Sequence, residues 1–237
     1  MTNNPLTNQI IAIDGPAGAG KGTLCRELAR TYRMKYLDTG TLYRAIGYRV
    51  VEVAKDLENE QDALDATKNF DFDFRHVGNN KFAPFLNDIN VAKELRQNTV
   101  GDAASKVGVF PSVRNALKDF QIDFIALWKP RCGVIMDGRD MGTVICPEAK
   151  VKFFLDAAPL IRAQRRLQEL EALGFDADFD NILTQVLERD NRDRNRKVAP
   201  LKPADDAHVI DTSHINAEEV LKQVTEIINK SLQLSRN

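Results

Sequence analysis

A run of nine residues near the N-terminus has the composition and spacing of a phosphate-binding loop. It follows a β-branched, strand-like segment and opens a helical pattern, which is the context that such a loop requires. Glycines let backbone N–H groups turn toward phosphates, and a helix N-terminus adds partial positive charge. Lys21 is then expected to reach the β- and γ-phosphates of ATP, and Thr23 to serve Mg²⁺ directly or through water. The run consists of Gly15, Pro16, Ala17, Gly18, Ala19, Gly20, Lys21, Gly22 and Thr23.

This loop departs from the strict GxxxxGK[ST] form, because Gly22 follows Lys21 and the hydroxyl comes one residue later. The variant resembles the loop of nucleoside monophosphate kinases such as adenylate kinase more than that of regulatory GTPases or motor ATPases. The alternative is a glycine-rich turn that binds nothing.

Two further segments place an arginine where it could meet an anion. In Asp38–Arg44, Thr41 is expected to cap a helix and Arg44 to lie in its first turn. A capped helix with a surface arginine is the alternative there. In Asp137–Thr143 (DGRDMGT), an arginine and an aspartate follow a strand at the edge where α/β sheets bind ligands. That arrangement suits a phosphate clamp beside a base-reading carboxylate, with a polar turn as the alternative.

The densest charge run is Glu188–Lys197. Continued as a helix, it puts Arg189, Arg192, Asp193 and Arg196 on one face, because spacings of three, four and seven residues share a face. Pairs of Glu188 with Arg192 and of Arg189 with Asp193 are expected at i,i+4. Such a run is usually a solvated surface. Beside a phosphate loop, we favour a mobile lid whose arginines close over phosphates.

The rest of the pattern predicts an α/β fold with a mostly parallel sheet flanked by helices, as in P-loop NTPases. Strands are expected at 9–14, 133–137, 151–156 and 208–211. Helices are expected at 23–32, 41–55, 111–127, 159–173, 180–192 and 216–232. We treat 1–237 as one kinase domain.

One stretch breaks this rhythm. Phe70–Val77 alternates apolar and polar residues, Gly78-Asn79-Asn80 follows, and Lys81–Leu86 is a second extended run. This is a β-hairpin pattern. It predicts a small insert at about 65–100 that binds the nucleoside monophosphate. The lid predicted from the arginine run covers about 174–200.

Composition excludes several classes. The 237 residues carry 33 Lys and Arg against 34 Asp and Glu, so nothing favours coating of nucleic acid or an anionic membrane. No apolar run approaches the ~18 residues that span a bilayer, and the cytosol is the expected compartment. Cys25, Cys132 and Cys146 form no metal or disulfide pattern and are expected to be reduced thiols.

Taken together, the motifs resemble those of bacterial cytidylate kinases, in the family's order and over nearly the whole chain, insert included. They are GPAGAGKGT, DTGTLYR, AASKVGVFPSVR, DGRDMGT and ERDNRDRNR with VAPL following. The loop alone identifies only a superfamily, whereas DGRDMGT and RDNRDRNR at this separation are more specific. Thr39 stands where the family often has serine and keeps the hydroxyl group. The stretch between Arg114 and Asp137 is slightly longer than is usual in the family.

The resemblance implies a monomeric enzyme of pyrimidine metabolism that binds only small nucleotides, taking ATP with Mg²⁺ and the acceptors CMP and dCMP. It assigns the CMP phosphate to Arg44, Arg139 and Arg196, the ribose to Arg189 and Asp193, and the cytosine to Ser105, Arg114 and Asp140. Thr39 and Tyr43 complete the acceptor set. Arg192 and Arg194 are the lid residues for ATP phosphates, and Lys21, Arg139, Arg192 and Arg196 carry the catalysis.

The physics agrees with cytosine as the base. Cytosine offers a 4-amino donor where uracil offers a 4-keto acceptor, and a carboxylate such as Asp140 pairs only with the donor. No general base is evident, since His76, His208 and His214 are expected to be structural. None is needed, because the attacking phosphate oxygen is already largely ionised near neutral pH.

Three rivals remain. Another P-loop kinase, acting on a different nucleotide or a hydroxylated metabolite, shares the loop but not the acceptor motifs. A nucleotide-dependent switch needs a guanine-reading motif such as NKxD, which this sequence lacks. An RNA-binding module using the arginine run leaves the phosphate loop unexplained and predicts salt-sensitive RNA binding without turnover.

Overall fold

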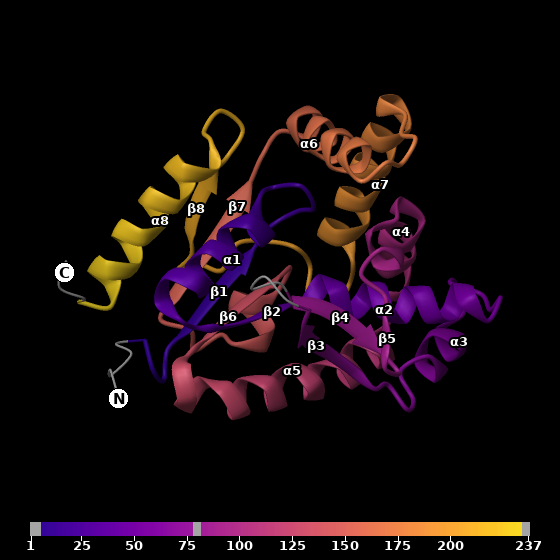
Figure 1. Ribbon diagram of the computed structural model, residues 1–237, viewed down its shortest axis with the longest axis horizontal. Helices are drawn as coiled ribbons and strands as arrows, with labels where there is room; N and C mark the ends of the chain where they lie inside the picture. The colour runs from indigo at the N-terminus through magenta and orange to yellow at the C-terminus, as the bar shows by residue number, and fades with distance from the viewer. Residues whose placement is uncertain (1–5, 78–81, 234–237) are drawn as a thin grey trace. The chain divides into compact units, whose positions relative to one another are not determined.

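A computed structural model describes residues 6–77 and 82–233 of the protein (Figure 1). The chain divides into two compact units. The first unit contains the chain up to Asp38 and again from Ile122, and the second contains Thr39–Gln121. Within the described ranges, no helix is long and apolar enough to cross a bilayer. Cys25, Cys132 and Cys146 all lie within the described residues and form no disulfide bond there.

Five parallel strands form the sheet of the first unit, in the order β2-β6-β1-β7-β8. All residues of β1 and β6 are buried, as expected for parallel strands covered on both faces. The strands are β1 (Ile10–Asp14), β2 (Lys35–Asp38), β6 (Val134–Gly138), β7 (Val151–Asp156) and β8 (His208–Asp211).

The carboxyl ends of these strands are in register and carry aspartates. Asp14 lies opposite Gly138, and Asp38 lies opposite Asp137. Asp156 lies opposite Asp211 on the other side of the sheet. The loops that leave this edge therefore begin close together, at the place where α/β sheets bind ligands.

Helices α1 (Lys21–Tyr32) and α8 (Ala217–Ser231) pack against each other and against one face of the sheet (Figure 1). Their apolar stripes meet alternate residues of β1 and β7 in the main core. The core includes Leu24, Leu28, Val224, Ile228, Ile11, Ile13 and Phe153. Helix α8 begins with a capping box between Asn216 and Glu219, which fixes its start.

Four more helical segments complete the first unit. A single π-helical turn, η2 (Met141–Ile145), follows β6. Helices α6 (Pro159–Ala172) and α7 (Phe179–Asn195) form a helical hairpin with its own small core of Ala163, Leu170 and Ile182. Helix α5 (Pro111–Cys132) begins in the second unit and ends in the first.

The second unit combines helices with a three-stranded antiparallel sheet. Helices α2 and α4 cross closely, because a Cβ on Gly47 would lie only 2.8 Å from the backbone of Ala103. Phe72 packs edge-on against Phe74 and Phe120, which joins the sheet to α5. The elements are α2 (Thr39–Glu52), α3 (Glu60–Asp65), β3 (Phe72–His76), β4 (Phe82–Leu86), β5 (Ile89–Asn90), the 3₁₀ turn η1 (Glu94–Arg96) and α4 (Asn98–Val107).

The predicted strands of the parallel sheet are confirmed to within one residue. The predicted hairpin is confirmed by the pairing of β3 with β4, although β3 begins two residues later than expected. Its turn, Gly78-Asn79-Asn80, and Lys81 lie outside the described residues. Helix α5 continues beyond the expected end at Leu127, through Pro130. The prediction of Thr41 as an N-cap is wrong, because β2 passes directly into α2 at Thr39 and leaves no loop for a later cap.

Candidate active site

The phosphate loop joins β1 to α1 at the carboxyl edge of the sheet, as the sequence predicted. Gly18 and Gly20 have φ angles of +80° and +92°, which L side chains rarely adopt, and both residues are exposed. Gly20 stands at the N-cap of α1 without a side-chain cap. The first N–H groups of the helix are therefore open to an anionic ligand.

Lys21 is buried and folds back onto the loop. Its Nζ donates to the carbonyl of Pro16 at 2.9 Å and lies 3.9 Å from Oδ1 of Asp137. Burial and the nearby Arg139 lower the pKa of Lys21 to about 8, while the carboxylates of Asp137 and Asp38 act in the opposite direction. The ammonium group is thus fixed beside the loop before any phosphate binds.

Asp137 is a functional candidate to which sequence reasoning assigned no role, although it opens the DGRDMGT motif. Its Oδ2 accepts the hydroxyl of Tyr36 at 3.1 Å, and burial raises its pKa to about 6 although Lys21 lowers it. The available signal was a strand-ending aspartate beside a phosphate loop.

The turn after β6 is anchored by Asp14, another residue that the sequence did not single out. Its two carboxylate oxygens accept the backbone N–H groups of Met141 and Gly142, each at 2.8 Å. Burial nevertheless raises the pKa of Asp14 to about 6. This anchor fixes the start of η2 and with it the preceding residues, Arg139 and Asp140.

Arg139 and two residues of α7 form an inner charge cluster. Arg139 Nε donates to Asp193 Oδ2 at 3.0 Å, and Arg189 Nε lies 3.8 Å from the same oxygen. Burial alone would raise the pKa of Asp193, but Arg139, Arg189 and Arg196 together bring it below its usual value. Burial would also lower the pKa of Arg139, which the carboxylate of Asp193 instead raises.

Arg196 belongs to the same cluster but not to the helix face on which it was predicted. Helix α7 ends at Asn195, and Arg196 has an extended ψ of 142°. The chain turns there because the Leu201 N–H donates to the Asp193 carbonyl at 2.8 Å. Arg196 Nε then donates to the carbonyl of Ala199 at 2.6 Å, and its Nη2 lies 3.7 Å from Asp140 Oδ1.

The other two arginines of the predicted lid are more exposed. Arg192 is paired with Glu188 at 3.9 Å and Arg194 with Asp156 at 3.1 Å. The exposed fractions of the two arginine side chains are 26% and 44%, against 15% for Arg139. The expected i,i+4 pairs of α7 are confirmed. The arginines thus divide into a buried group around Asp193 and an outer group.

Arg162 of α6 is a buried residue that the sequence gave no reason to select from the neighbouring arginines. It donates from Nη1 to the carbonyl of Ala17 in the phosphate loop at 3.2 Å. It also forms a two-pronged ion pair with Asp190 of α7. Thr23 is exposed, and its hydroxyl oxygen accepts from Arg26 at 3.3 Å.

The remaining predicted residues lie in the second unit. Arg44 donates to the carbonyl of Leu95 at 2.7 Å, and Arg114 donates to that of Gly108 at 3.3 Å. The Arg114 guanidinium lies 5.8 Å from the ring centre of Tyr43. Ser105 is buried on α4, and Thr39 is buried at the start of α2.

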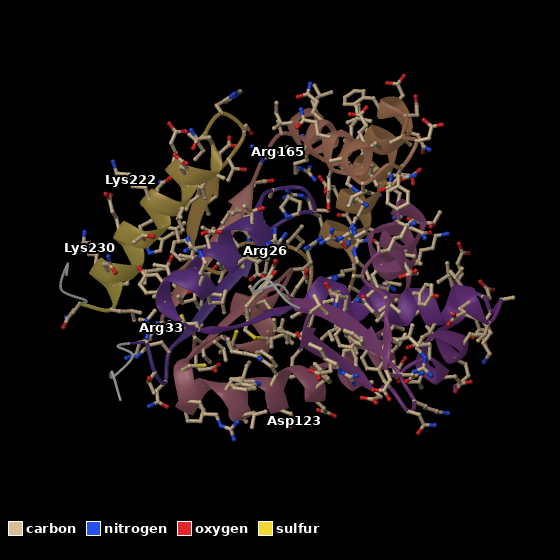
Figure 2. The ribbon with its side chains drawn as sticks, in the orientation of Figure 1. Arg26, Arg33, Asp123, Arg165, Lys222 and Lys230 are labelled. Carbon is tan, nitrogen blue, oxygen red and sulfur yellow. The ribbon has the colours of Figure 1, made fainter. Side chains whose placement is uncertain are left out.

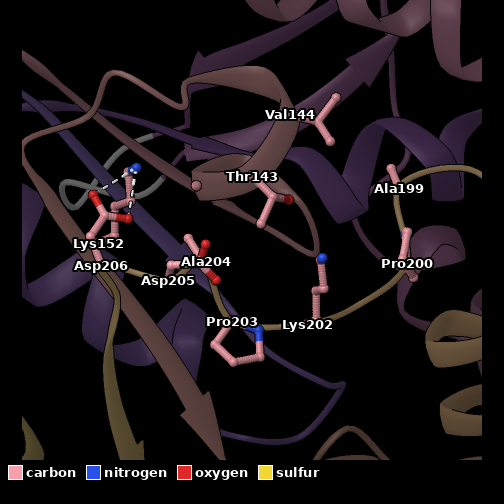
Figure 3. A pocket seen from close by; sticks show the side chains of 11 residues that line it. Thr143, Val144, Lys152, Ala199, Pro200, Lys202, Pro203, Ala204, Asp205 and Asp206 are labelled. Carbon is pink, nitrogen blue, oxygen red and sulfur yellow. Dashed lines mark hydrogen bonds and ion pairs between the residues drawn. The ribbon is translucent and has the colours of Figure 1, made fainter.

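A separate hollow of about 490 Å³ lies beside the η2 turn (Figure 3). It is lined by residues 142–144, by Lys152 and by the segment 199–206 apart from Leu201. Lys152 pairs there with Asp206 at 2.9 Å. None of the predicted site residues lines this hollow, whose charged residues are two lysines and two aspartates, Lys152, Lys202, Asp205 and Asp206.

Comparison with known proteins gives consistent matches. The family model for cytidylate kinase matches residues 11–230. A protein named cytidylate kinase from Mannheimia succiniciproducens is 44% identical over 228 residues, covering 96% of this chain and 99% of that protein. Cytidylate kinase 1 of Haemophilus influenzae is 44% identical over 221 residues, covering 93% and 94%. A solved shikimate kinase from Acinetobacter baumannii, in complex with shikimate, is 14% identical and covers 97% of both chains with a TM-score of 0.46.

Proposed function

The chain belongs to the cytidylate kinase family, and on this basis we propose that it transfers the γ-phosphoryl group of ATP to CMP and dCMP. The products are ADP with CDP or dCDP. One observation in the structure supports this most directly. Asp14 and Gly138 are opposite each other in paired strands, so the phosphate loop and the Arg139–Asp140 turn leave the sheet side by side.

The donor side is the phosphate loop with Lys21. Its exposed glycines and the open N-terminus of α1 suit the β- and γ-phosphates. Arg192 and Arg194, the outer arginines, are free enough of burial to move toward the transferred group when the segment 174–200 closes as a lid.

On the acceptor side, the buried arginines fit a dianionic phosphate. We assign Arg139 and Arg196 to the phosphate of CMP and Arg189 with Asp193 to its ribose. Asp140 is buried and pairs with the 4-amino group of cytosine. In the second unit, where the insert at about 65–100 lies, the assigned residues are Thr39, Tyr43, Arg44, Ser105 and Arg114.

The reaction needs no protein base. An ionised phosphate oxygen of CMP forms the new bond to the γ-phosphorus of ATP while the bond from that phosphorus to the bridging oxygen of ADP breaks. The protein aligns the two phosphates, stabilises their charge with Lys21 and the arginines, and excludes water that would otherwise hydrolyse ATP.

Mg²⁺ fits the donor set beside the loop. Mg²⁺ in kinases is held by phosphate oxygens with one or two protein oxygens, and the hydroxyl of Thr23 and the carboxylate of Asp137 are such oxygens. When bound, Mg²⁺ would neutralise charge on the phosphates. Arg26 and Tyr36, which hydrogen-bond these two groups, orient them.

The test is a coupled assay of ADP formation with ATP and Mg²⁺, offering CMP, dCMP, UMP, AMP, GMP or no acceptor in parallel. Rapid turnover with CMP and dCMP alone supports the proposal. Equal turnover with all acceptors, or turnover with none, would contradict the assignment of CMP and dCMP as acceptors and would support only the P-loop fold. Gel filtration of the same sample tests the expected monomer.

A further inference from the structure

Three carbonyl groups of the phosphate loop each accept a hydrogen bond from a side chain. Pro16 accepts from Lys21, the loop's own lysine, at 2.9 Å. Ala17 accepts from Arg162 of α6 at 3.2 Å. The third carbonyl, that of Ala19, accepts from the hydroxyl of Thr212 at 3.1 Å. Two of the three donors therefore come from elements far from the loop in sequence.

Fixing a carbonyl also fixes the N–H of the same peptide unit. In a trans peptide the C=O and N–H groups point in opposite directions, and no described peptide bond is cis. Bonds to the carbonyls of Ala17 and Ala19 hold the N–H groups of Gly18 and Gly20 away from Arg162 and Thr212. Successive N–H groups held in this way form an anion-binding concavity.

The hydroxyl of Thr212 is well placed to donate to Ala19. Arg165 donates to this hydroxyl oxygen at 3.0 Å, so the hydroxyl proton remains available for a carbonyl. The hydroxyl also lies 3.2 Å from the carbonyl of Asp156, which accepts the Thr212 N–H at 2.8 Å and so keeps a hydrogen-bond partner without the hydroxyl. Ala19 is fully buried, so its carbonyl cannot turn to solvent instead.

Arg162 is equally constrained. Its side chain is 1% exposed, Nε donates to the carbonyl of Ala157 at 2.8 Å, and both terminal nitrogens contact Asp190 of α7. A Cβ built on Gly18 would lie 3.0 Å from the Arg162 Cβ, so the loop packs directly on this residue. The guanidinium has little room to release Ala17.

We propose that Thr212 and Arg162 are positioning residues that preorganise the phosphate loop by holding its carbonyls away from the ligand. The inference rests on the proposed function only in that the loop binds the phosphates of ATP. A loop held in its binding conformation spends less free energy on ordering when phosphate arrives. Losing either side chain should therefore weaken the binding of the triphosphate chain of ATP. The binding of the nucleoside part of ATP and of CMP, which the loop is not proposed to hold, should change little.

The test uses Thr212→Val, which keeps the side-chain shape and removes the donor. We measure dissociation constants of ATP, inorganic tripolyphosphate and CMP by calorimetry, and the melting temperature. A net hydrogen bond corresponds to a change of ~5- to 10-fold. We expect ATP and tripolyphosphate to bind more weakly by about that factor, with CMP within about twofold and folding retained, and Thr212→Ser to restore binding.

Thr67→Val is the matched control, because the Thr67 hydroxyl also donates to a backbone carbonyl, that of Leu64 at 2.7 Å, but in the second unit. It should change none of the three affinities. If Thr212→Val does not fold, Arg162→Lys, which keeps the charge but not the geometry toward Ala17, should show the same selective loss.

Four results separate the possibilities. Unchanged binding of ATP and tripolyphosphate by a folded variant overturns the inference alone. Weakened ATP with unchanged tripolyphosphate places Thr212 at the base or ribose and also overturns it. An equal loss for CMP indicates general destabilisation and does the same. If the unmodified protein binds neither ATP nor tripolyphosphate, both the proposed function and this inference are wrong.

Discussion

The guanidinium of Arg139 donates from Nε to Oδ2 of Asp193 across 3.0 Å and so joins the turn after β6 to helix α7. The two side chains are largely buried, at 15% and 8% exposed. Arg189 and Arg196 add positive charge around the same carboxylate. Asp193 is therefore the anion that compensates the positive charge of these three arginines.

Asp193→Asn should lower the free energy of unfolding by ~3 kcal/mol, because removing one partner of a buried ion pair leaves the other charge uncompensated. Urea unfolding measures this. Asp180→Asn is the control, since Asp180 is exposed in the first turn of the same helix and should cost less than ~1 kcal/mol. Equal losses in the two variants would contradict the assignment of Asp193.

Asp140→Ala should narrow the preference for CMP over UMP. The carboxylate is buried and can accept from the 4-amino group of cytosine, which uracil lacks. Its loss should reduce the ratio of the two kcat/KM values by ~5- to 150-fold, corresponding to ~1–3 kcal/mol. Asp140→Asn should narrow the ratio further, because an amide can also donate to the 4-keto group. An unchanged ratio would remove Asp140 from base recognition.

Local patterns predicted most of the first unit. The β-branched run before Gly15 and the helical spacing after Lys21 are contained in about twenty residues, so the sequence alone placed the loop between β1 and α1. The aspartates at the strand ends were also present in these local patterns, but no role was assigned to Asp14 or Asp137. Helix α4 was missed although Val100, Ala103, Ala104 and Val107 have helical spacing, because Gly101 weakens the pattern and the neighbouring hairpin dominated it.

The contacts that hold the site together were not predictable, because they join segments distant in sequence. Arg162 and Ala17 are 145 residues apart, and Thr212 and Ala19 are 193 apart. No local sequence feature distinguishes Arg162 from Arg165. Likewise, none distinguishes a threonine that hydrogen-bonds a loop carbonyl from one that is exposed to solvent. Arg196 was misplaced for a related reason. The hydrogen bond from the Leu201 N–H to the Asp193 carbonyl closes the end of α7, so the helix ends at Asn195, one residue before Arg196.

Arg192→Ala should lower kcat by ~10³-fold or more while weakening CMP binding much less, as expected for an arginine that acts on charge in the transferred group. Its side chain is 26% exposed and pairs with Glu188 at 3.9 Å, a long contact on the surface of α7. Steady-state kinetics and CMP calorimetry separate the two effects.

Arg166→Ala is the control for this variant, because Arg166 pairs with Glu169 on α6 at 2.8 Å and has no assigned role. Both kinetic constants should stay within about twofold. If Arg192→Ala instead raised the dissociation constant of CMP and left kcat intact, Arg192 would belong to ground-state binding of the acceptor.

The pH dependence of stability should carry the signature of Asp14. Burial raises its pKa from 3.8 to about 6, so its contribution is fully present below pH ~4 and is lost as pH rises through 6, a change of ~3 kcal/mol. Asp14→Asn stays neutral throughout. The free energy of unfolding of the unmodified protein, minus that of this variant, should therefore fall between pH 4 and pH 7 in urea titrations.

Asp123→Asn, at an exposed position of α5 (Figure 2), controls for loss of a carboxylate. A difference that stays flat for Asp14→Asn would show that the two N–H bonds from the η2 turn outweigh its burial.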